Sequence, residues 1–267
     1  WKGKPWACQQ GAGEATGDWF LFLDADTRLE AGAMARFTAL TADPSHVYSV
    51  CPYHRIRRPY EELSSFFNVI MLAGVNAFGR RPDPSGAIGL FGQVLLISRG
   101  HHDAVGGHEA VRGEVLENFQ LAGHLAEQGI GRSCFLGRGS VRMRMFPGGI
   151  AELCASWKKG FAAGATNTPR RALVLVSLWL TGAMLALGGL ILAATPIASN
   201  CCRLVAVLVY VLYVLQCRRV FRLAGSFSFV NALLFPCSLL FYQGLFFTSI
   251  IERRIGIKTR WKGRRVD

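Results

Sequence analysis

A run of 23 residues without a charged side chain, residues 172–194, constrains this chain more than any other feature. The run is almost entirely apolar, and Arg170 and Arg171 directly precede it. About 20 consecutive apolar residues are enough for a helix to cross the hydrocarbon core of a bilayer. The run therefore predicts a membrane-spanning helix.

Two further apolar segments follow, at residues 201–217 and 229–251. The first of them is short for a membrane span, and Pro236 interrupts the second. Three regions are therefore expected: a globular part (residues 1–168), membrane helices (residues 169–254) and a basic cytoplasmic tail (residues 255–267).

The positive charge of the chain is concentrated in its second part. Residues 1–169 hold 17 basic and 15 acidic side chains, whereas residues 170–267 hold 13 basic and 2 acidic ones. The basic side chains cluster at the ends of the apolar segments, which is typical of membrane proteins. No polar basic helix is available to lie along a duplex, so nucleic acid is not an expected partner.

Before the first apolar segment, short apolar runs alternate with helical patterns, which predicts an α/β sheet. The runs are bounded by Gly, Pro and Asp, as strands commonly are. Expected strands cover residues 19–23, 47–52, 90–97, 134–136 and 140–145, and expected helices cover residues 6–15, 31–42, 61–78 and 114–127.

Asp24 and Asp26 follow the apolar run 19–23, separated only by Ala25. Open α/β sheets bind their ligands beyond the carboxyl ends of their strands. Two close carboxylates repel each other unless a cation lies between them, and Mg²⁺ or Mn²⁺ bridging to a diphosphate would relieve that repulsion. The alternative is a solvated turn, because Asp is a common turn residue.

The acidic pair belongs to a set of motifs that together resemble the membrane-bound family 2 glycosyltransferases. The branch in question includes carotenoid (4,4′-diaponeurosporenoate) and hopene-associated glycosyltransferases. The matching stretches are KPWACQQG (residues 4–11), ATGDW (15–19), LDADT (23–27), GGHEAV (106–111), EVLEN (114–118), RMFPGG (144–149) and WKGR (261–264).

The resemblance implies a GT-A fold, a nucleotide-sugar donor and a lipid acceptor. It assigns Asp24 and Asp26 to a divalent metal, and Asp24 also to the donor diphosphate. The acceptor base of the family is usually the Asp of a Glu-Asp pair, which here reads Glu117-Asn118. An amide cannot take a proton, so either Glu117 is the base or this copy is catalytically impaired.

The resemblance also implies substrate-binding roles for Gly106, Gly107, His108 and Arg144. Two glycines permit close approach of a ligand to the backbone, and an arginine would stabilise a leaving diphosphate. The alternatives are a plain loop for residues 106–108 and a lipid-facing arginine at position 144.

The chain opens at Trp1 inside the expected catalytic domain, so we expect an N-terminally truncated piece. The first nucleotide-binding strands of the family have no counterpart in the sequence. Contacts to the nucleotide base and ribose therefore cannot be assigned.

The predicted activity is transfer of a hexose from a nucleotide-sugar to a carotenoid or hopanoid type of lipid. A processive polysaccharide synthase of the same superfamily is an alternative, but its Gln-x-x-Arg-Trp signature is absent. A catalytically impaired membrane scaffold is the alternative from another class of protein.

The expected location is the plasma membrane, with several spans and the catalytic domain in the cytoplasm. A third full span would place the basic tail outside, against the positive-inside rule. Residues 229–251 are therefore expected to re-enter the same side or to lie in the interface. The alternative is that residues 204–215 fail to span.

Overall fold

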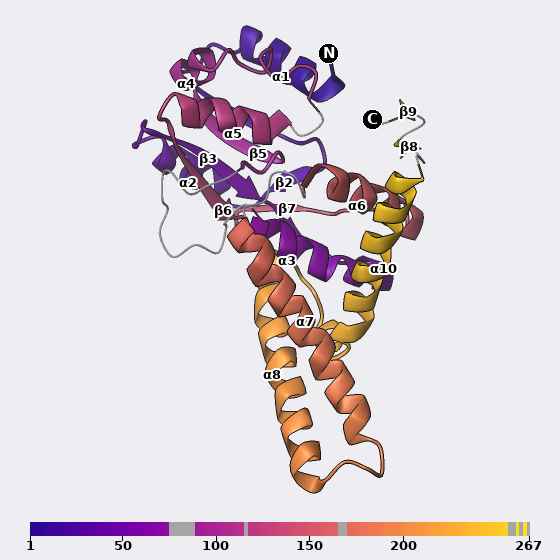
Figure 1. Cartoon of the computed structure of the whole chain (residues 1–267). Coiled ribbons are helices and arrows are strands. Elements are labelled where there is room, and N and C mark those ends of the chain that lie inside the picture. Colours follow the sequence, from indigo (N-terminus) through magenta and orange to yellow (C-terminus); the bar gives the residue numbers. More distant parts are fainter. Residues whose placement is uncertain (75–88, 115–116, 165–169, 256–259, 262–263, 266–267) are drawn as a thin grey trace. The chain divides into compact units, whose positions relative to one another are not determined.

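The computed structural model describes residues 1–74, 89–114, 117–164, 170–255, 260–261 and 264–265. The chain divides into two units, each built from segments far apart in the sequence (Figure 1). Unit 1 comprises residues 1–54, 72–144 and 163–168, and unit 2 comprises residues 55–71, 145–162 and 169–267. Two segments of the expected globular part therefore group with the apolar helices, namely residues 55–71 and 145–162.

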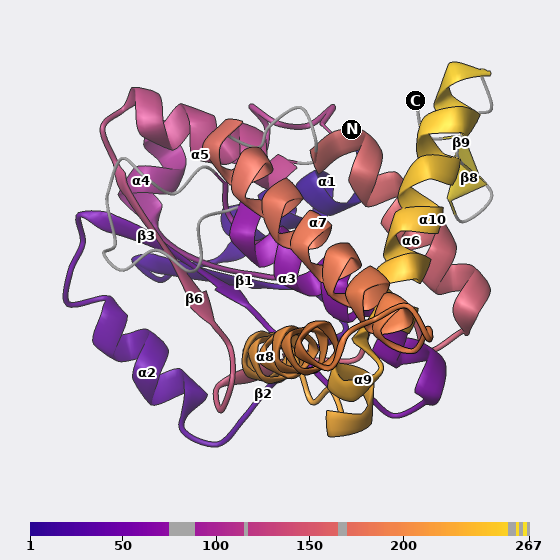
Figure 2. The same cartoon turned by 60° about the horizontal axis from the view of Figure 1, so that its bottom comes forward.

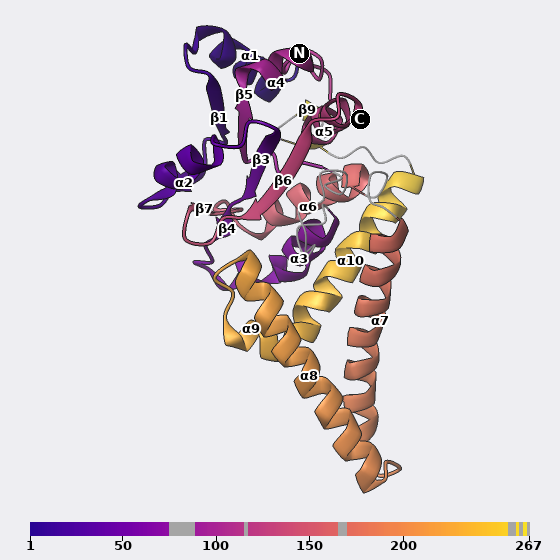
Figure 3. The same cartoon turned by 90° about the vertical axis from the view of Figure 1, so that its left-hand side faces the viewer.

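Unit 1 is built around a mixed four-stranded sheet, whose strand order is visible in Figure 3. The order is β1 (Trp19–Leu23), β5 (Val94–Ser98), β3 (His46–Cys51) and β6 (Gly131–Leu136). Strand β5 is antiparallel to both of its neighbours, whereas β3 and β6 are parallel. Strands β1, β3 and β6 therefore share one direction, and the expected α/β class is confirmed.

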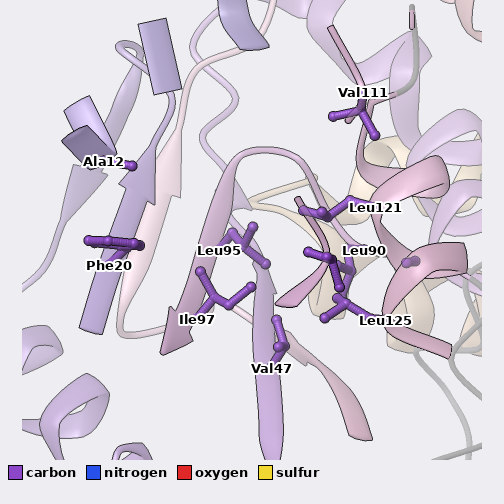
Figure 4. Packing of buried hydrophobic residues seen from close by; sticks show 11 residues of the cluster. Ala12, Phe20, Val47, Leu90, Leu95, Ile97, Val111, Leu121 and Leu125 are labelled. Atoms are coloured by element: carbon purple, nitrogen blue, oxygen red, sulfur yellow. The ribbon is translucent and has the colours of Figure 1, made fainter. Parts of the chain in front are cut away.

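Helices cover both faces of this sheet because its strands carry apolar side chains on both sides. Leu95 and Ile97 of β5 belong to one buried cluster, together with Leu121 and Leu125 of α5 (Figure 4). Val94 and Leu96, which alternate with them, pack with α2 in a second cluster. Figure 2 shows α2 on one side of the sheet and α4 and α5 on the other. The helices are α1 (Gly3–Glu14), α2 (Ala33–Leu40), α4 (Arg99–Ala104) and α5 (Glu117–Glu127).

A second, three-stranded sheet of unit 1 brings the residues after Asp26 beside the last strand of the unit. Its order is β2 (Thr27–Leu29), β7 (Val141–Met143) and β4 (Tyr53–His54). Thr27 pairs with Met143 in the antiparallel β2–β7 ladder. The chain direction on both strands therefore places the backbone of Arg144 next to that of Asp26.

The helix expected at residues 61–78 is divided, and its last four residues lie outside the described part of the chain. A 3₁₀ helix, η1 (Pro59–Ser64), precedes the α-helix α3 (Ser65–Gly74). The carboxylate of Glu61 accepts the backbone N–H groups of Arg57 and Arg58, at 2.6 and 3.4 Å. These bonds satisfy donors that a helix start leaves unpaired.

Two helices of unit 2 are long and apolar enough to cross a membrane. They are α7 (Arg170–Ala193) and α8 (Asn200–Ala224), with mean hydropathies of 2.1 and 1.8 in their most apolar windows. Such helices also occur in soluble cores, but here only 11% and 17% of those windows is buried. Helix α8 extends beyond the expected segment 201–217, which was short for a span, and the whole helix is long enough to cross a bilayer. The two helices lie side by side (Figures 1 and 3).

The segment 229–251 forms two helices rather than one. Helix α9 (Phe229–Leu233) ends at Leu234, and α10 (Phe235–Arg254) begins directly after it. The hydroxyl of Ser228 caps α9 by accepting the N–H of Asn231 at 3.0 Å. Helix α10 is not one of the two span candidates among the described residues. The break agrees with the expectation that this segment is no single straight span, while its re-entry stays a prediction.

Aromatic side chains fill the interior of unit 2. Phe67 of α3 stacks on Trp157 of α6 (Ile150–Gly164), with ring centroids 4.8 Å apart, and contacts Tyr242 of α10 at 4.9 Å. Lys158 pairs with Glu252 at 2.5 Å. Trp157 and Lys158 are therefore both engaged in contacts inside the unit. The tail expected at residues 255–267 contains two short paired strands, β8 (Arg260–Trp261) and β9 (Arg264–Arg265).

Candidate active site

Asp24 lies where strand β1 ends, as the sequence predicted. Its N–H donates to the carbonyl of Gln93 at 2.9 Å, which continues the pairing of β1 with the β5 segment. Its carbonyl accepts the N–H of Thr27 at 2.9 Å and closes a tight turn. The turn leaves Asp26 exposed, while the side chain of Asp24 is 31% exposed. Both carboxylates are therefore accessible at the carboxyl end of a strand.

Lys4, in the first turn of α1, joins this turn to the start of α5. Its Nζ lies 2.8 Å from Oδ1 of Asp24 and 3.1 Å from Oε1 of Glu117. It also donates to the carbonyl of Gly92 at 2.7 Å. A Cβ at Gly92 would overlap the amide of Asn118, so this close approach requires glycine. Three segments that are distant in sequence, those of Asp24, Gly92 and Glu117, thus contact the ammonium group of Lys4.

The Glu117-Asn118 pair opens helix α5. Glu117 is buried, with 7% of its surface exposed, and Oε1 accepts both the Lys4 contact and the Nδ2–H of Asn118, at 3.0 Å. A carboxylate at the first turn of a helix is also favoured by the helix dipole. The side chain of Asn118 therefore holds the neighbouring carboxylate in place. The structure brings together the two candidate positions for a base.

The electrostatics of the cluster couple its three charged groups. Burial raises the pKa of Asp24, and the charge of Lys4 opposes that rise. Asp26 and Glu117 add to the rise by repulsion. Burial lowers the pKa of Lys4, but the carboxylates of Glu117 and Asp24 outweigh it, so the pKa is raised. Lys4 is therefore a permanent cation at neutral pH.

The Gly106-Gly107-His108 loop follows α4 and has left-handed glycines, with φ of 76° and 61°. The imidazole of His108 is 2% exposed, and its Nδ1 lies 3.1 Å from Nε2 of His102. A Cβ at Gly107 would lie 2.7 Å from the His102 ring and 2.8 Å from Gln9. The second glycine thus has a packing role, and the substrate roles of these three residues stay predictions.

The two imidazoles form a buried neutral pair. Burial lowers the pKa of His108 to about 4, with contributions from His102 and Lys4. Burial also lowers the pKa of His102, against the opposing effect of Asp103. The ring of Phe22, on strand β1, contacts His108 with centroids 4.6 Å apart. The histidine pair therefore supports the strand that carries Asp24.

Arg144 follows strand β7, and the β2–β7 ladder places its backbone beside that of Asp26. Its side chain is partly exposed. The structure thus puts the predicted arginine at the same edge as the acidic turn, and its role toward a diphosphate stays a prediction.

Two members of the cluster, Lys4 and Gly92, were not predicted from the sequence. Lys4 lies in the stretch 4–11, which is one of the motifs that carry the resemblance, so the sequence did mark this region as functional. Nothing in that stretch indicated its contact with Glu117, which is 113 positions away. Gly92 lies outside all of the motifs that carry the resemblance.

The residues present fit a divalent metal only in a limited way. Among the described residues, no group of three or more His, Cys, Asp or Glu side chains could hold a metal ion by itself. Mg²⁺ commonly uses one or two carboxylates and takes its remaining ligands from substrate phosphates and water. The carboxylates of Asp24 and Asp26 match that donor set.

Comparison with known proteins finds relatives that are named as glycosyltransferases. No protein-family model matches the chain. A protein of Staphylococcus aureus (strain USA300) named 4,4′-diaponeurosporenoate glycosyltransferase is 29% identical over 268 residues, which cover 99% of this chain and 71% of that protein. A protein of the same name from Staphylococcus haemolyticus (strain JCSC1435) is 30% identical over 72% of this chain and 52% of its own length. The chain therefore resembles carotenoid glycosyltransferases over almost its whole length.

Proposed function

We propose that this protein is a glycosyltransferase that moves a sugar from a nucleotide-sugar to a carotenoid-type lipid acceptor at a membrane. The observation that carries the proposal is the convergence of Lys4, Asp24 and Glu117 at the carboxyl end of strand β1. The names of the relatives supply the acceptor class. A GT-A type of domain is supported by the sheet covered by helices on both faces.

In the proposed reaction, an acceptor oxygen forms a bond to the anomeric carbon of the donor sugar. The bond between that carbon and the diphosphate oxygen breaks, and the nucleoside diphosphate leaves with the bonding electrons. Negative charge develops on the leaving oxygen, so a fixed cation nearby lowers the barrier. Lys4 and Arg144 are the cations that we assign to the diphosphate. When bound by Asp24 and Asp26, a divalent metal would neutralise the same charge.

Asn118 stands where the family usually has the Asp that serves as acceptor base. A carboxylate acceptor would explain this difference. The relatives are named after 4,4′-diaponeurosporenoate, and the ending denotes a carboxylate. An ionised carboxylate has no proton to lose at neutral pH, so transfer to it requires no general base. A hydroxyl acceptor, in contrast, needs one. We therefore propose that Glu117 positions Lys4, and that this site favours an acid acceptor over an alcohol.

Plasma-membrane location with a cytoplasmic catalytic domain is also proposed, on the basis of the basic helix ends. Arg170 and Arg171 open α7, and Arg218, Arg219 and Arg222 lie near the end of α8. The positive-inside rule places both ends in the cytoplasm. Substituting Lys262 by Cys in a variant whose eight native cysteines are replaced by Ser, and treating intact cells with a membrane-impermeant thiol reagent, tests this orientation. The tail should be labelled only after lysis, and labelling before lysis would reject a cytoplasmic tail.

Two alternatives remain. A catalytically impaired scaffold is suggested by Asn118 in the place of the expected base. A polysaccharide synthase would extend a sugar chain rather than transfer once. The products therefore distinguish the three functions: a scaffold would form no product, a synthase would form a polymer, and the proposed enzyme would form a singly glycosylated lipid.

The decisive experiment incubates the purified protein with labelled nucleotide-sugars, Mn²⁺ and a long-chain polyene carboxylic acid. Asp24→Asn should abolish transfer, whereas Asp18→Asn, an exposed residue near the start of the same strand, should not. A single glycosyl ester is the expected product. Absence of both transfer and donor hydrolysis would favour the scaffold, and polymer would favour the synthase.

A further inference from the structure

A second site lies in unit 2, away from the acidic turn in the sequence. A pocket of about 520 Å³ is lined by η1 and the residues before it, by the segment before α9, and by α9 with the start of α10. Its wall includes the guanidinium-bearing Arg57 and Arg58, and the apolar side chains of Leu63, Val230 and Leu234. The lining of the pocket thus combines basic and apolar side chains.

Hydrogen bonds between distant segments hold the walls of this pocket together. The N–H of Ile56 donates to the hydroxyl of Ser226 at 2.8 Å. The N–H of Ser228 donates to the Glu62 carboxylate at 3.1 and 3.3 Å, and the Asn231 amide donates to the Glu62 carbonyl at 3.2 Å. A pocket fixed by such bonds is preformed, which lowers the cost of ordering it on binding.

The two arginines of the wall are free to bind a ligand. Both are exposed, and neither guanidinium has a hydrogen bond or ion pair within the part of the chain that the structure describes. Their backbone N–H groups are held by Glu61, which fixes the position of the segment. Glu62 is the acid that lines this pocket, and its carboxylate is already bound by the N–H of Ser228. Burial raises the pKa of Glu62, while the hydrogen bonds from Ser228 and Asn231 and the charge of Arg218 oppose that rise. The net charge presented to a ligand is therefore positive.

The surroundings of the pocket are those of a membrane interface. Helix α9 exposes Phe229 and Val230 by 51% and 59%, and Leu233 and Leu234 by 43% and 50%. Four residues, 225–228, separate it from the arginine-rich end of α8. Basic pockets beside apolar membrane helices suit the headgroups of anionic lipids.

We propose that this pocket binds a membrane phospholipid with an anionic headgroup. Arg57 and Arg58 pair with the phosphodiester, and an acyl chain lies against Val230 and Leu234. Arginine suits a phosphate oxyanion because its planar fork can donate two hydrogen bonds. The inference does not depend on the transferase reaction, because it concerns a lipid that is bound and not converted.

The test is native mass spectrometry of the full-length protein in detergent, titrated with phosphatidylglycerol or phosphatidylcholine. Phosphatidylglycerol should bind the wild type more tightly, and R57Q/R58Q should weaken its binding about tenfold or more. The matched control R219Q/R222Q removes the same charge from exposed arginines of α8, outside the pocket. It should retain the tight site. If both double variants lost phosphatidylglycerol binding equally, general surface charge would explain the effect and the proposal would be overturned. Unchanged binding in both variants would overturn it as well.

Two further measurements keep the proposal falsifiable. Palmitate, a long-chain carboxylate without a phosphate, should not displace phosphatidylglycerol; displacement would instead make the pocket a carboxylate acceptor site. If R57Q/R58Q does not fold, phosphatidylglycerol with a photoreactive headgroup can be crosslinked to the wild type. Crosslinks should fall on peptides containing residues 56–63 or 226–238, and crosslinks found only elsewhere would refute the assignment.

Discussion

Replacing Lys4 by Met tests whether one ammonium group organises the candidate active site. The substitution keeps the length of an unbranched side chain but removes the charge next to Asp24 and Glu117. Glu117 would then be a buried carboxylate with only the amide of Asn118 as its polar partner in the cluster. Breaking a fully buried pair costs about 3–5 kcal/mol.

The cost here is smaller because the side chains of Lys4 and Asp24 are 37% and 31% exposed, and water can replace part of what is lost. We expect about 2 kcal/mol, between the values for exposed and buried pairs. For a domain of this size, that corresponds to a loss of about 4–8 °C in Tm. The transfer rate should fall about 100-fold or more, as when one electrostatic stabiliser of a transition state is removed.

The assays are thermal unfolding of the detergent-purified protein and transfer from a labelled nucleotide-sugar. Lys2→Met is the matched control, because the exposed Lys2 side chain lies two positions earlier. Lys2 is bonded through its backbone: its N–H donates to the carbonyl of Arg112 and its carbonyl accepts the N–H of Trp6. This control should have the Tm and the transfer rate of the wild type. In Lys4→Met the pKa of Asp24 should rise further, since Lys4 lowers it, and the acidic limb of the pH–rate profile should move to higher pH. A variant with the Tm, rate and pH profile of the wild type would refute the reasoning.

Four further outcomes are expected. Asp26→Asn should leave Tm unchanged because Asp26 is exposed, yet it should reduce transfer and its response to Mn²⁺; full activity in EDTA would remove the metal from the proposal. Asn118→Asp should not accelerate transfer to a carboxylic acid but should accelerate transfer to an alcohol, and acceleration with both acceptors would show that a base is missing. Glu117→Gln should cost both stability and rate because it removes a partner of Lys4; an unchanged Tm with abolished transfer to the alcohol alone would make Glu117 the base. The pKa of His108 is about 4 in the folded protein against an ordinary 6.5, so between these values the unfolded state binds more protons. The free energy of unfolding should therefore decrease as the pH is lowered from 6.5 to 4, by up to about 3 kcal/mol, and denaturant titrations of His108→Asn should show a smaller decrease; an equal decrease in the variant would remove His108 as the cause.

Features set by short-range patterns were predicted well from the sequence. The apolar run 19–23 ends at an acidic turn, and in the structure it is strand β1 followed by Asp24. The charge-free run 172–194 is helix α7 apart from its last residue. Both succeed because the period of apolar residues, and the length of an uninterrupted run, act within a single element.

The helical region shows where such patterns fail. Residues 201–217 were expected to form a short, marginal span, yet α8 continues through Arg218, Arg219 and Arg222 to Ala224. Charged side chains interrupt an apolar pattern without interrupting a helix, because Arg has a high helix propensity. Apolar length therefore underestimated helical length.

The tertiary structure alone decided the strand order β1-β5-β3-β6 and the meeting of Lys4, Gly92, Asp24 and Glu117 at its edge. It also decided that His108 is packed against His102 rather than exposed in its loop. The contacts of Lys4 join positions that are 20 to 113 residues apart, and the amino acids on each side are compatible with many partners. The sequence determined that the chain would form an α/β part with an acidic turn and apolar helices. Which charges neutralise that turn depends on how the elements pack, because an ion pair is set by distance in space and not by distance along the chain.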